Sequence, residues 1–225
     1  MQLNLTKILS FNAGYVDTAS FLALHGLFAA HVTGNFVTLG AAWVSYSQSG
    51  AWAKLAALPM FCIAVLLVKL LDRQFLKQQK SSYTFLLKVI FILFCIAAII
   101  SVFYLPFPSH DTIISFVVGV LLVCAMAIQN AMHRLHWKKE TPTTVMTGST
   151  TQLMLDVGAL FSNPSLEQKT QIKQRIATIL PTMISFAFGC AVAAVVYKFA
   201  LIWLFIVPPV VVLAAYLNRE HYNRA

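Results

Sequence analysis

Long apolar stretches separated by short polar ones run along almost the whole chain of 225 residues. A helix needs about 20 mostly apolar residues to cross the hydrocarbon core of a bilayer. One stretch of this length, residues 8–29, is more polar than the others because Asp17 and His25 lie within it. Five further stretches are predicted as clear membrane spans, at about residues 55–72, 86–105, 113–133, 178–197 and 199–217.

Two further apolar segments, 33–47 and 145–161, are too short to cross a bilayer upright. Each opens with a Thr-Gly pair, follows a helix with polar side chains and precedes two long apolar runs. The motifs are Thr33-Gly34-Asn35 and Thr147-Gly148-Ser149. The order helix, Thr-Gly segment, helix, helix therefore occurs twice. We expect one integral membrane domain over residues 1–225, made of two repeats at about 1–111 and 112–225.

The composition supports a membrane protein. Hydrophobic residues make up 59% of the chain and charged residues 10%, whereas soluble domains have about 45–50% apolar and about 25% charged residues. This excludes a soluble globular enzyme, a disordered chain and a disulfide scaffold. The net charge of +9 lies between the apolar blocks, with no nucleic-acid-binding motif. We therefore expect it to orient the chain in the membrane and to contact anionic lipid, with no nucleic acid as partner.

The positive charges decide between six and eight spans. If the Thr-Gly segments do not cross, almost all Lys and Arg residues share one side, with Lys54 and Lys198 opposite and Lys69 within a span. If the segments do cross, the charges divide almost equally. Because positive residues favour the cytoplasmic side, the sequence predicts six spans with both termini cytoplasmic. The residues on that side are Lys7, Arg73, Lys77, Lys80, Lys88, Arg134, Lys138, Lys139, Lys169, Lys173, Arg175, Arg219 and Arg224.

Three spans per repeat make the second repeat inverted relative to the first. The predicted fold class is an all-α polytopic membrane bundle of about six transmembrane helices in two inverted three-helix repeats, each with a broken or re-entrant Thr-Gly segment. Transporters often use this plan. Non-helical backbone survives at membrane depth only where protein or a water-filled cavity satisfies it. The sequence leaves open whether the segments re-enter the membrane or lie at its surface.

A basic stretch at residues 163–177 alternates apolar and charged positions. Asn163-Pro164-Ser165 is a helix-start signal. We expect a short amphipathic helix lying on the cytoplasmic membrane surface; a docking helix for a partner protein is the alternative.

Asp17 is the sharpest candidate for chemistry. A carboxylate in the middle of a span costs about 2.5–3.5 kcal/mol on insertion scales and often marks an ion or proton pathway. The alternative is a structural hydrogen bond to the backbone near Thr33-Gly34-Asn35. His25, eight positions after Asp17, is the candidate proton relay; an interfacial histidine is the alternative.

The Thr-Gly motifs are candidate pathway residues for a different reason. Glycine permits close backbone approach, and Thr, Asn and Ser cap helix N-termini. A capped N-terminus inside the membrane presents N–H groups to an anion or a polar solute. The alternative is that the capping only satisfies a broken helix. Thr33, Gly34, Asn35, Thr147, Gly148 and Ser149 are all assigned to the pathway on these grounds.

The second repeat carries neutral amides, Gln129 and Asn130, where the first has Asp17. They are assigned to the same solute or ion pathway, with bridging between helices as the alternative. Asp156 in the second short segment is expected to pair with a Lys or Arg. His133 and His136 have metal-ligand spacing but no third ligand, so we interpret them as surface histidines and predict no metal site.

Small residues and prolines carry structural expectations. Ser10, Gly14 and Thr18, and likewise Ser185, Gly189 and Ala193, recur every four positions. Such stripes let helices pack closely. Pro208-Pro209 should kink or break the last apolar run, whereas Pro181 is tolerated near the start of its span.

The residues Gly14-Tyr15-Val16-Asp17 followed by Val32-Thr33-Gly34-Asn35 resemble the YoaK-type family of small bacterial inner-membrane proteins with a domain of unknown function. The second half agrees, through Gln129-Asn130-Ala131 followed by Thr143-Thr144-Val145-Met146-Thr147-Gly148. The resemblance spans nearly the whole chain. It implies about six spans and a multi-pass location in the bacterial inner (plasma) membrane, and no established activity.

Together these features favour a small transporter or channel for a small polar solute or ion, with proton coupling through Asp17. The alternative is a structural or accessory inner-membrane protein that binds lipid or a partner protein, and a homo-oligomer is open in either case. No nucleophile motif or metal cluster is found, so we predict no enzyme and no cofactor.

Overall fold

The computed structural model describes residues 5–44, 50–108, 110–137, 140–144, 146–162 and 164–218. All regular structure within these ranges is helical. The elements are α1 (Leu5–Ala23), α2 (Gly34–Val44), α3 (Ala51–Lys77), α4 (Tyr83–Tyr104), α5 (Ile113–His136), α6 (Met146–Leu160), α7 (Leu166–Phe199), the 3-10 helix η1 (Leu201–Trp203) and α8 (Val207–Leu217).

Four helices in the described ranges are long and apolar enough to cross a membrane, namely α3, α4, α5 and α7. Each coincides with one of the predicted spans to within one residue or contains it. α1 has 19 residues but carries Asn12 and Asp17, and α8 is apolar but has 11 residues. The coarse prediction of an all-helical membrane bundle is therefore confirmed.

The first predicted span, 8–29, is too long. α1 ends at Ala23, and the N–H of Gly26 donates to the carbonyl of Phe21 at 2.8 Å. His25 and Gly26 both have positive φ, at 55° and 81°. A bond that spans six residues and follows a left-handed residue, here His25, is a common helix terminator. The chain after Gly26 therefore leaves the helix and turns back.

The predicted surface helix at 163–177 is not a separate element. α7 runs without interruption for 34 residues, because residues 166–180 contain neither glycine nor proline. Ser165 caps its start through a reciprocal bond pair with Gln168; the predicted start residue Asn163 lies outside the described residues. The amphipathic stretch is thus the first part of the same helix as the span 178–197.

The last predicted span, 199–217, is broken as the prolines predict. α7 ends at Phe199, and α8 begins at Val207 with Pro208 and Pro209 in its first turn. Proline is accepted there because the first helical N–H groups have no partner within the helix.

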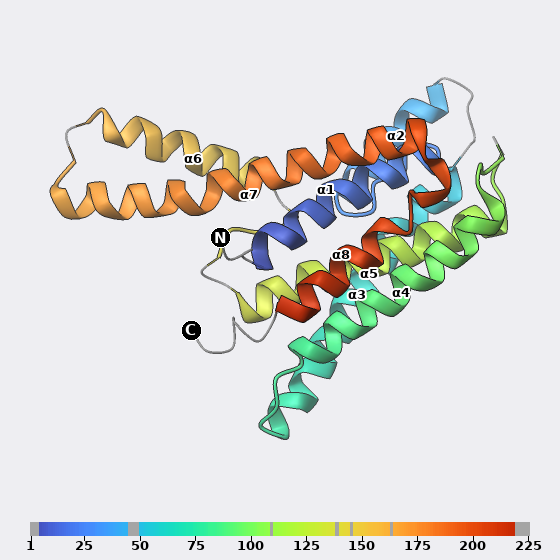
Figure 1. Cartoon of the computed structure of the whole chain (residues 1–225), viewed down its shortest axis with the longest axis horizontal. Coiled ribbons are helices and arrows are strands. Elements are labelled where there is room, and N and C mark those ends of the chain that lie inside the picture. Colours follow the sequence, from blue (N-terminus) through green and yellow to red (C-terminus); the bar gives the residue numbers. More distant parts are fainter. Residues whose placement is uncertain are drawn as a thin grey trace.

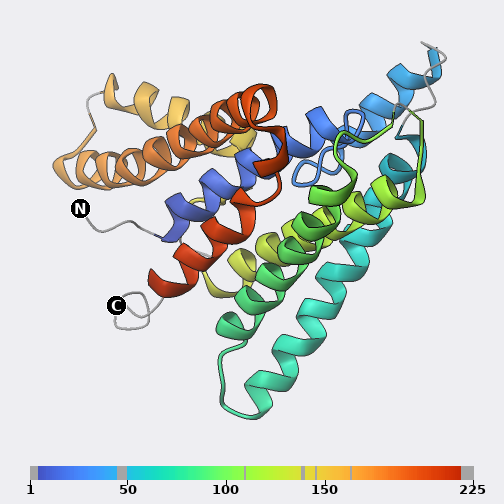
Figure 2. The same ribbon diagram turned by 45° about the vertical axis from the view of Figure 1, so that its right-hand side comes forward.

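The helices pair across the two halves of the chain. α1 packs along α7, and α5 lies between α3 and α4. The short helices lie on the long helices that follow them, α2 on α3 and α6 on α7, while α8 contacts α4 and α1. The α6–α7 hairpin projects from one end of the bundle (Figures 1 and 2).

Corresponding helices run in opposite directions. α1 and α5 are antiparallel, and so are α3 and α7 (Figures 1 and 2). The first helix of each half packs on the third helix of the other half, α1 on α7 and α5 on α3. α1 begins and α8 ends at the same end of the bundle (Figure 1).

The small-residue stripes pack closely, as predicted, and the structure pairs the two stripes with each other at the α1–α7 interface. A Cβ on Gly14 would lie 2.1 Å from the carbonyl oxygen of Phe186, and a Cβ on Gly189 would lie 2.1 Å from that of Phe11. The hydroxyl of Ser185 donates to the carbonyl of Lys7 at 2.7 Å. Only glycine allows the two backbones to approach this closely.

Candidate functional site

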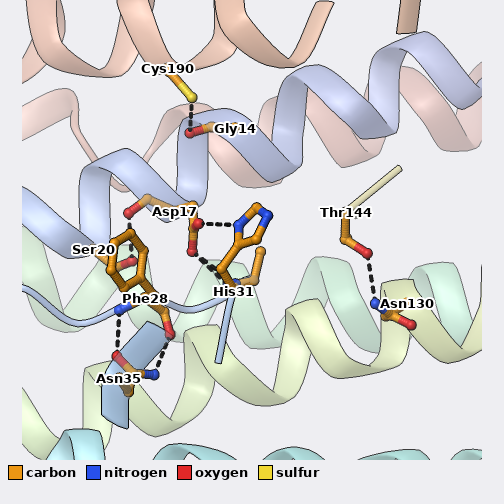
Figure 3. Close-up of polar contacts among 10 residues, drawn as sticks. Gly14, Asp17, Ser20, Phe28, His31, Asn35, Asn130, Thr144 and Cys190 are labelled. Atoms are coloured by element: carbon orange, nitrogen blue, oxygen red, sulfur yellow. Dashed lines mark hydrogen bonds and ion pairs between the residues drawn. The ribbon is translucent and has the colours of Figure 1, made fainter. Parts of the chain in front are cut away.

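Asp17 lies on the buried side of α1 and holds the chain segment that turns back from the helix end. One carboxylate oxygen accepts hydrogen bonds from the backbone N–H groups of Ala30, at 2.7 Å, and His31, at 3.3 Å. The other oxygen lies 2.6 Å from Nδ1 of the His31 ring (Figure 3). The Asp17 carboxylate therefore binds two loop residues, Ala30 and His31, which lie 13 and 14 positions later in the chain.

The local sequence explains why the loop reaches Asp17. α1 ends six residues after Asp17, and the left-handed turn at His25 and Gly26 sends the chain back along the helix. The N–H groups of Ala30 and His31 are then inside the bundle, out of reach of regular helix partners. An ionised carboxylate can accept both, and buried backbone donors require such a partner.

The first Thr-Gly motif is fastened by its asparagine. The Asn35 side chain donates to the carbonyl of Phe28 and accepts from the N–H of the same residue, both at 2.8 Å (Figure 3). Asn35 is 1% exposed. A Cβ on Gly34 would lie 3.0 Å from the Phe28 ring, so a larger residue there would press on that ring. Thr33 is exposed.

The second half has a neutral counterpart of the Asp17–His31 contact. The amide of Asn130 on α5 donates to the hydroxyl of Thr144 at 2.6 Å (Figure 3). Both contacts join residues fourteen positions apart, and both connect the first helix of a half to the loop that precedes a Thr-Gly motif.

Gln129 links the two halves directly. Its carbonyl oxygen accepts from the Asn12 amide at 3.0 Å, and its own amide donates to the Leu9 carbonyl at 2.9 Å. A longer contact of 3.4 Å reaches the hydroxyl of Thr143. Gln129 is fully buried, so this network joins α1 to α5 in the interior of the bundle.

The second Thr-Gly motif has a different environment from the first. Thr147 and Gly148 are exposed, and a Cβ on Gly148 would meet open space. The next hydroxyls, on Thr150 and Thr151, donate to carbonyls four residues earlier at 2.9 and 3.1 Å. Ser149 is buried. The structure therefore gives Asp17, Asn35, Gln129 and Asn130 buried or partly buried hydrogen-bond partners but leaves the Thr147-Gly148 face open.

Asp156 pairs with a basic residue, as predicted. Two nitrogens of the Arg175 guanidinium reach its two oxygens at 2.6 and 3.0 Å, and Gln152 donates to it at 3.0 Å. The hydrogen bonds from Arg175 hold the pKa of Asp156 below its ordinary value. This pair fastens α6 to the first part of α7.

The histidines lie elsewhere than the sequence suggested. Nε2 of His25 has no hydrogen-bond partner among the described residues, and His25 lines a cavity at the end of α1. The surface prediction for His133 and His136 is wrong. His133 is 4% exposed, and Nε2 of His136 lies 3.0 Å from the hydroxyl of Ser82, which donates to Asp72 at 2.6 Å. This cluster ties together α3, α4 and α5 because their ends meet there.

Sequence reasoning missed His31, Asn12, Thr143 and Thr144. His31 lies two positions before the first Thr-Gly pair. The sequence therefore shows that His31 is close to this motif, but it does not show that Asp17 is its partner. The equal fourteen-residue spacing in both halves is the signal that could have found the two loop residues. In the described part of the chain, no group of three His, Cys, Asp or Glu side chains is placed to hold a metal ion.

The comparisons with known proteins agree with the resemblance seen in the motifs. The family model described as "Protein of unknown function (DUF1275)" matches residues 5–218. The chain is 30% identical over 194 residues to "UPF0700 transmembrane protein YoaK" of Bacillus subtilis (strain 168), covering 84% of this chain and 81% of that protein. No solved structure matches the chain.

Proposed function

The chain is a membrane protein that belongs to the DUF1275 family of unknown function, and from this premise we propose that it is a small transporter or channel for a small polar solute or ion. The observation that carries the proposal is the Asp17–His31 pair. An ionisable carboxylate and an imidazole meet there in the interior of a membrane bundle, next to non-helical backbone. Ionisable residues inside membrane spans often mark substrate or ion pathways and proton relays.

The proton-coupled version of the proposal rests on the exposure of the pair. The Asp17 side chain is 6% exposed, whereas that of His31 is 37% exposed. In this version of the proposal, His31 exchanges a proton through its exposed side while its Nδ1 remains against the buried carboxylate. If Asp17 only accepted hydrogen bonds from two backbone N–H groups, it would need no titratable partner such as His31. Asn130 and Thr144 give the second half a neutral polar contact, so coupling is assigned to the first half.

We propose six spans in two inverted repeats, with α2 and α6 as re-entrant segments and η1 with α8 completing the sixth span. The opposite directions of α1 and α5, and of α3 and α7, support this arrangement. We propose that the protein lies in the bacterial inner membrane with both termini cytoplasmic, because the six-span topology puts most Lys and Arg residues on that side. Four of those residues, Lys138, Lys139, Arg219 and Arg224, lie outside the described residues.

The pathway in this proposal runs through Asp17, Gln129, Asn130 and the two Thr-Gly motifs. The protein contacts membrane lipids and one small solute or ion, and we assign it no enzymatic reaction and no cofactor. Self-association is compatible with this role.

The experiment is a flux assay on the purified chain in liposomes that contain a pH-sensitive dye. Sodium, potassium, chloride, phosphate, single amino acids and simple sugars are supplied one at a time, and proton movement is recorded. A carrier should move protons with one of them, and Asp17→Asn should abolish that movement. Glu167→Gln, which removes an exposed carboxylate on α7, is the matched control. Undiminished proton movement in folded Asp17→Asn would reject the coupled carrier.

The accessory role remains the second candidate because of the projecting α6–α7 hairpin (Figure 2). Its exposed Lys169 and Lys173 suit anionic lipid or an acidic partner. Changing both lysines to alanine should then alter the cellular phenotype more than Asp17→Asn does, whereas the transporter proposal expects the reverse order.

A further inference from the structure

A cavity of about 320 Å³ lies at the end of the bundle where α1 ends and where α3 and α5 begin. This is the end opposite to the start of α1 (Figure 1). Its walls include Leu24, His25, Trp52, Asp111, Ile113 and Phe116. None of these residues belongs to the Asp17 network, so the cavity is separate from the pathway proposed above.

The carboxylate in the wall is fixed by the backbone of another helix. Asp111, just before α5, accepts from the N–H of Gly50 and, at 3.5 Å, from that of Trp52. It thereby caps the start of α3, which has no side-chain cap of its own. A carboxylate has about four acceptor positions, so two backbone donors leave it able to accept further hydrogen bonds.

The charges around the cavity favour a cation. Asp111 lines it, whereas Lys54, a buried lysine that interacts electrostatically with Asp111, is not among the lining residues. His25 is the other titratable lining residue. Its Nε2 is buried and has no hydrogen-bond partner among the described residues. Asp111 is the one acidic side chain among the lining residues that the structure describes.

The rest of the wall is mostly apolar and aromatic; its other polar side chains, Thr112 and Ser115, are hydrogen-bonded to each other in the cap of α5. An ion that entered the cavity would lose its hydration water to walls formed by Leu24, Ile113 and the rings of Trp52 and Phe116. A strongly hydrated metal ion resists this loss of water. An organic ammonium tolerates such walls, because aromatic faces attract cations within about 6 Å of the ring and its apolar body replaces water there. Cavities of about 300–1,000 Å³ with apolar walls and few polar groups are the usual form of small-molecule sites.

We propose that this cavity binds a small organic monocation, with its ammonium group at Asp111 and its apolar body between Trp52 and Phe116. The site goes beyond the proposed transport function, because it requires neither Asp17 nor movement of a solute. It sits where three segments from both halves of the chain meet. A ligand there would therefore stabilise the contact between the starts of α3 and α5.

The test measures binding by isothermal calorimetry on the purified full chain in detergent at pH 8. The probes are 2-phenylethylammonium, its neutral analogue 2-phenylethanol and the anion 3-phenylpropionate. We expect the cation to bind at least tenfold more tightly than either analogue. Equal binding of the three probes, or no binding to the folded chain, would overturn the proposal.

Variants then locate the site. Asp111→Asn should weaken binding of the cation at least tenfold and leave the alcohol unchanged. Because Asp111 also caps α3, a second variant leaves it in place: Ala53→Phe fills the cavity from a buried lining position and should abolish binding. Glu167→Gln is the control for loss of a carboxylate elsewhere. Unchanged binding in folded Ala53→Phe would contradict the proposal, and none of these results depends on the flux assay.

Discussion

The carboxylate of Asp17 lies 2.6 Å from Nδ1 of His31, fourteen positions further along the chain. The same carboxylate accepts hydrogen bonds from two backbone N–H groups of the loop that carries His31. One side chain therefore holds the loop in place and forms an ionisable pair. The equivalent contact in the second half, Asn130 with Thr144, has only the first of these roles.

The two roles of Asp17 can be separated by substitution. Asp17→Asn keeps a carbonyl oxygen for the N–H groups of Ala30 and His31, whereas Asp17→Ala leaves both without a partner. We expect Asp17→Ala to lower stability by about 1–3 kcal/mol more than Asp17→Asn, the cost of an unsatisfied buried donor. Thermal unfolding in detergent measures the difference. Equal stability of the two variants would mean that the loop does not depend on this acceptor.

Asn35 uses both the oxygen and the NH2 group of its side-chain amide to bind the backbone of Phe28. Because it donates to and accepts from Phe28, Asn35→Asp loses the donor and places a second acceptor against a carbonyl. We expect Asn35→Asp to be as destabilising as Asn35→Ala, each by about 1–3 kcal/mol. Thr33→Ala, at an exposed neighbouring position, is the control and should be near neutral. A well-tolerated Asn35→Asp would show that the donor is unnecessary.

Gly189 should not accept a methyl group. Its added Cβ would lie 2.1 Å from the backbone oxygen of Phe11, and backbone cannot rotate away as a side chain can. We expect Gly189→Ala to destabilise the protein by about 1–3 kcal/mol through overpacking. Gly40→Ala is the matched control, because a Cβ there meets open space and alanine favours a helix by about 0.5–1 kcal/mol. The two variants should therefore shift the unfolding temperature in opposite directions.

The Asp156–Arg175 pair should make the docking of α6 depend on pH. The pKa of Asp156 is lowered in the folded chain by the Arg175 hydrogen bonds. Its contribution is therefore fully present above the ordinary carboxyl pKa of about 3.9 and is lost as the pH falls through the lowered value. Amide hydrogen exchange in α6 should be faster in Asp156→Asn than in the unchanged chain at pH 7. If exchange at pH 7 is the same, the pair does not hold α6.

Thiol labelling tests the proposed topology. In a chain whose four cysteines are replaced, single cysteines at Thr33 and Thr147, both exposed, should react with a small water-soluble reagent. The inverted arrangement predicts reaction from opposite or alternating sides of the membrane. Reaction of both from one side alone would contradict the inverted repeat, and failure of both in a folded protein would favour packing elements and the accessory role.

The sequence by itself determined the helical membrane class, the family and the positions of the long helices α3, α4 and α5. These follow from local properties, namely the length of apolar runs and the spacing of motifs. It also identified the two small-residue stripes as close-packing surfaces and the break at Pro208-Pro209, because small residues and prolines act on the backbone wherever they stand.

Only the tertiary structure decided which polar groups meet. Periodicity pointed to His25 as the partner of Asp17, since both could share one helix face. The left-handed turn at His25 and Gly26 ends that helix, carries His25 to the cavity and returns His31 to the carboxylate. A pattern along the chain records spacing, whereas a hydrogen bond depends on where the chain reverses. Two turn residues therefore determined the partner of Asp17.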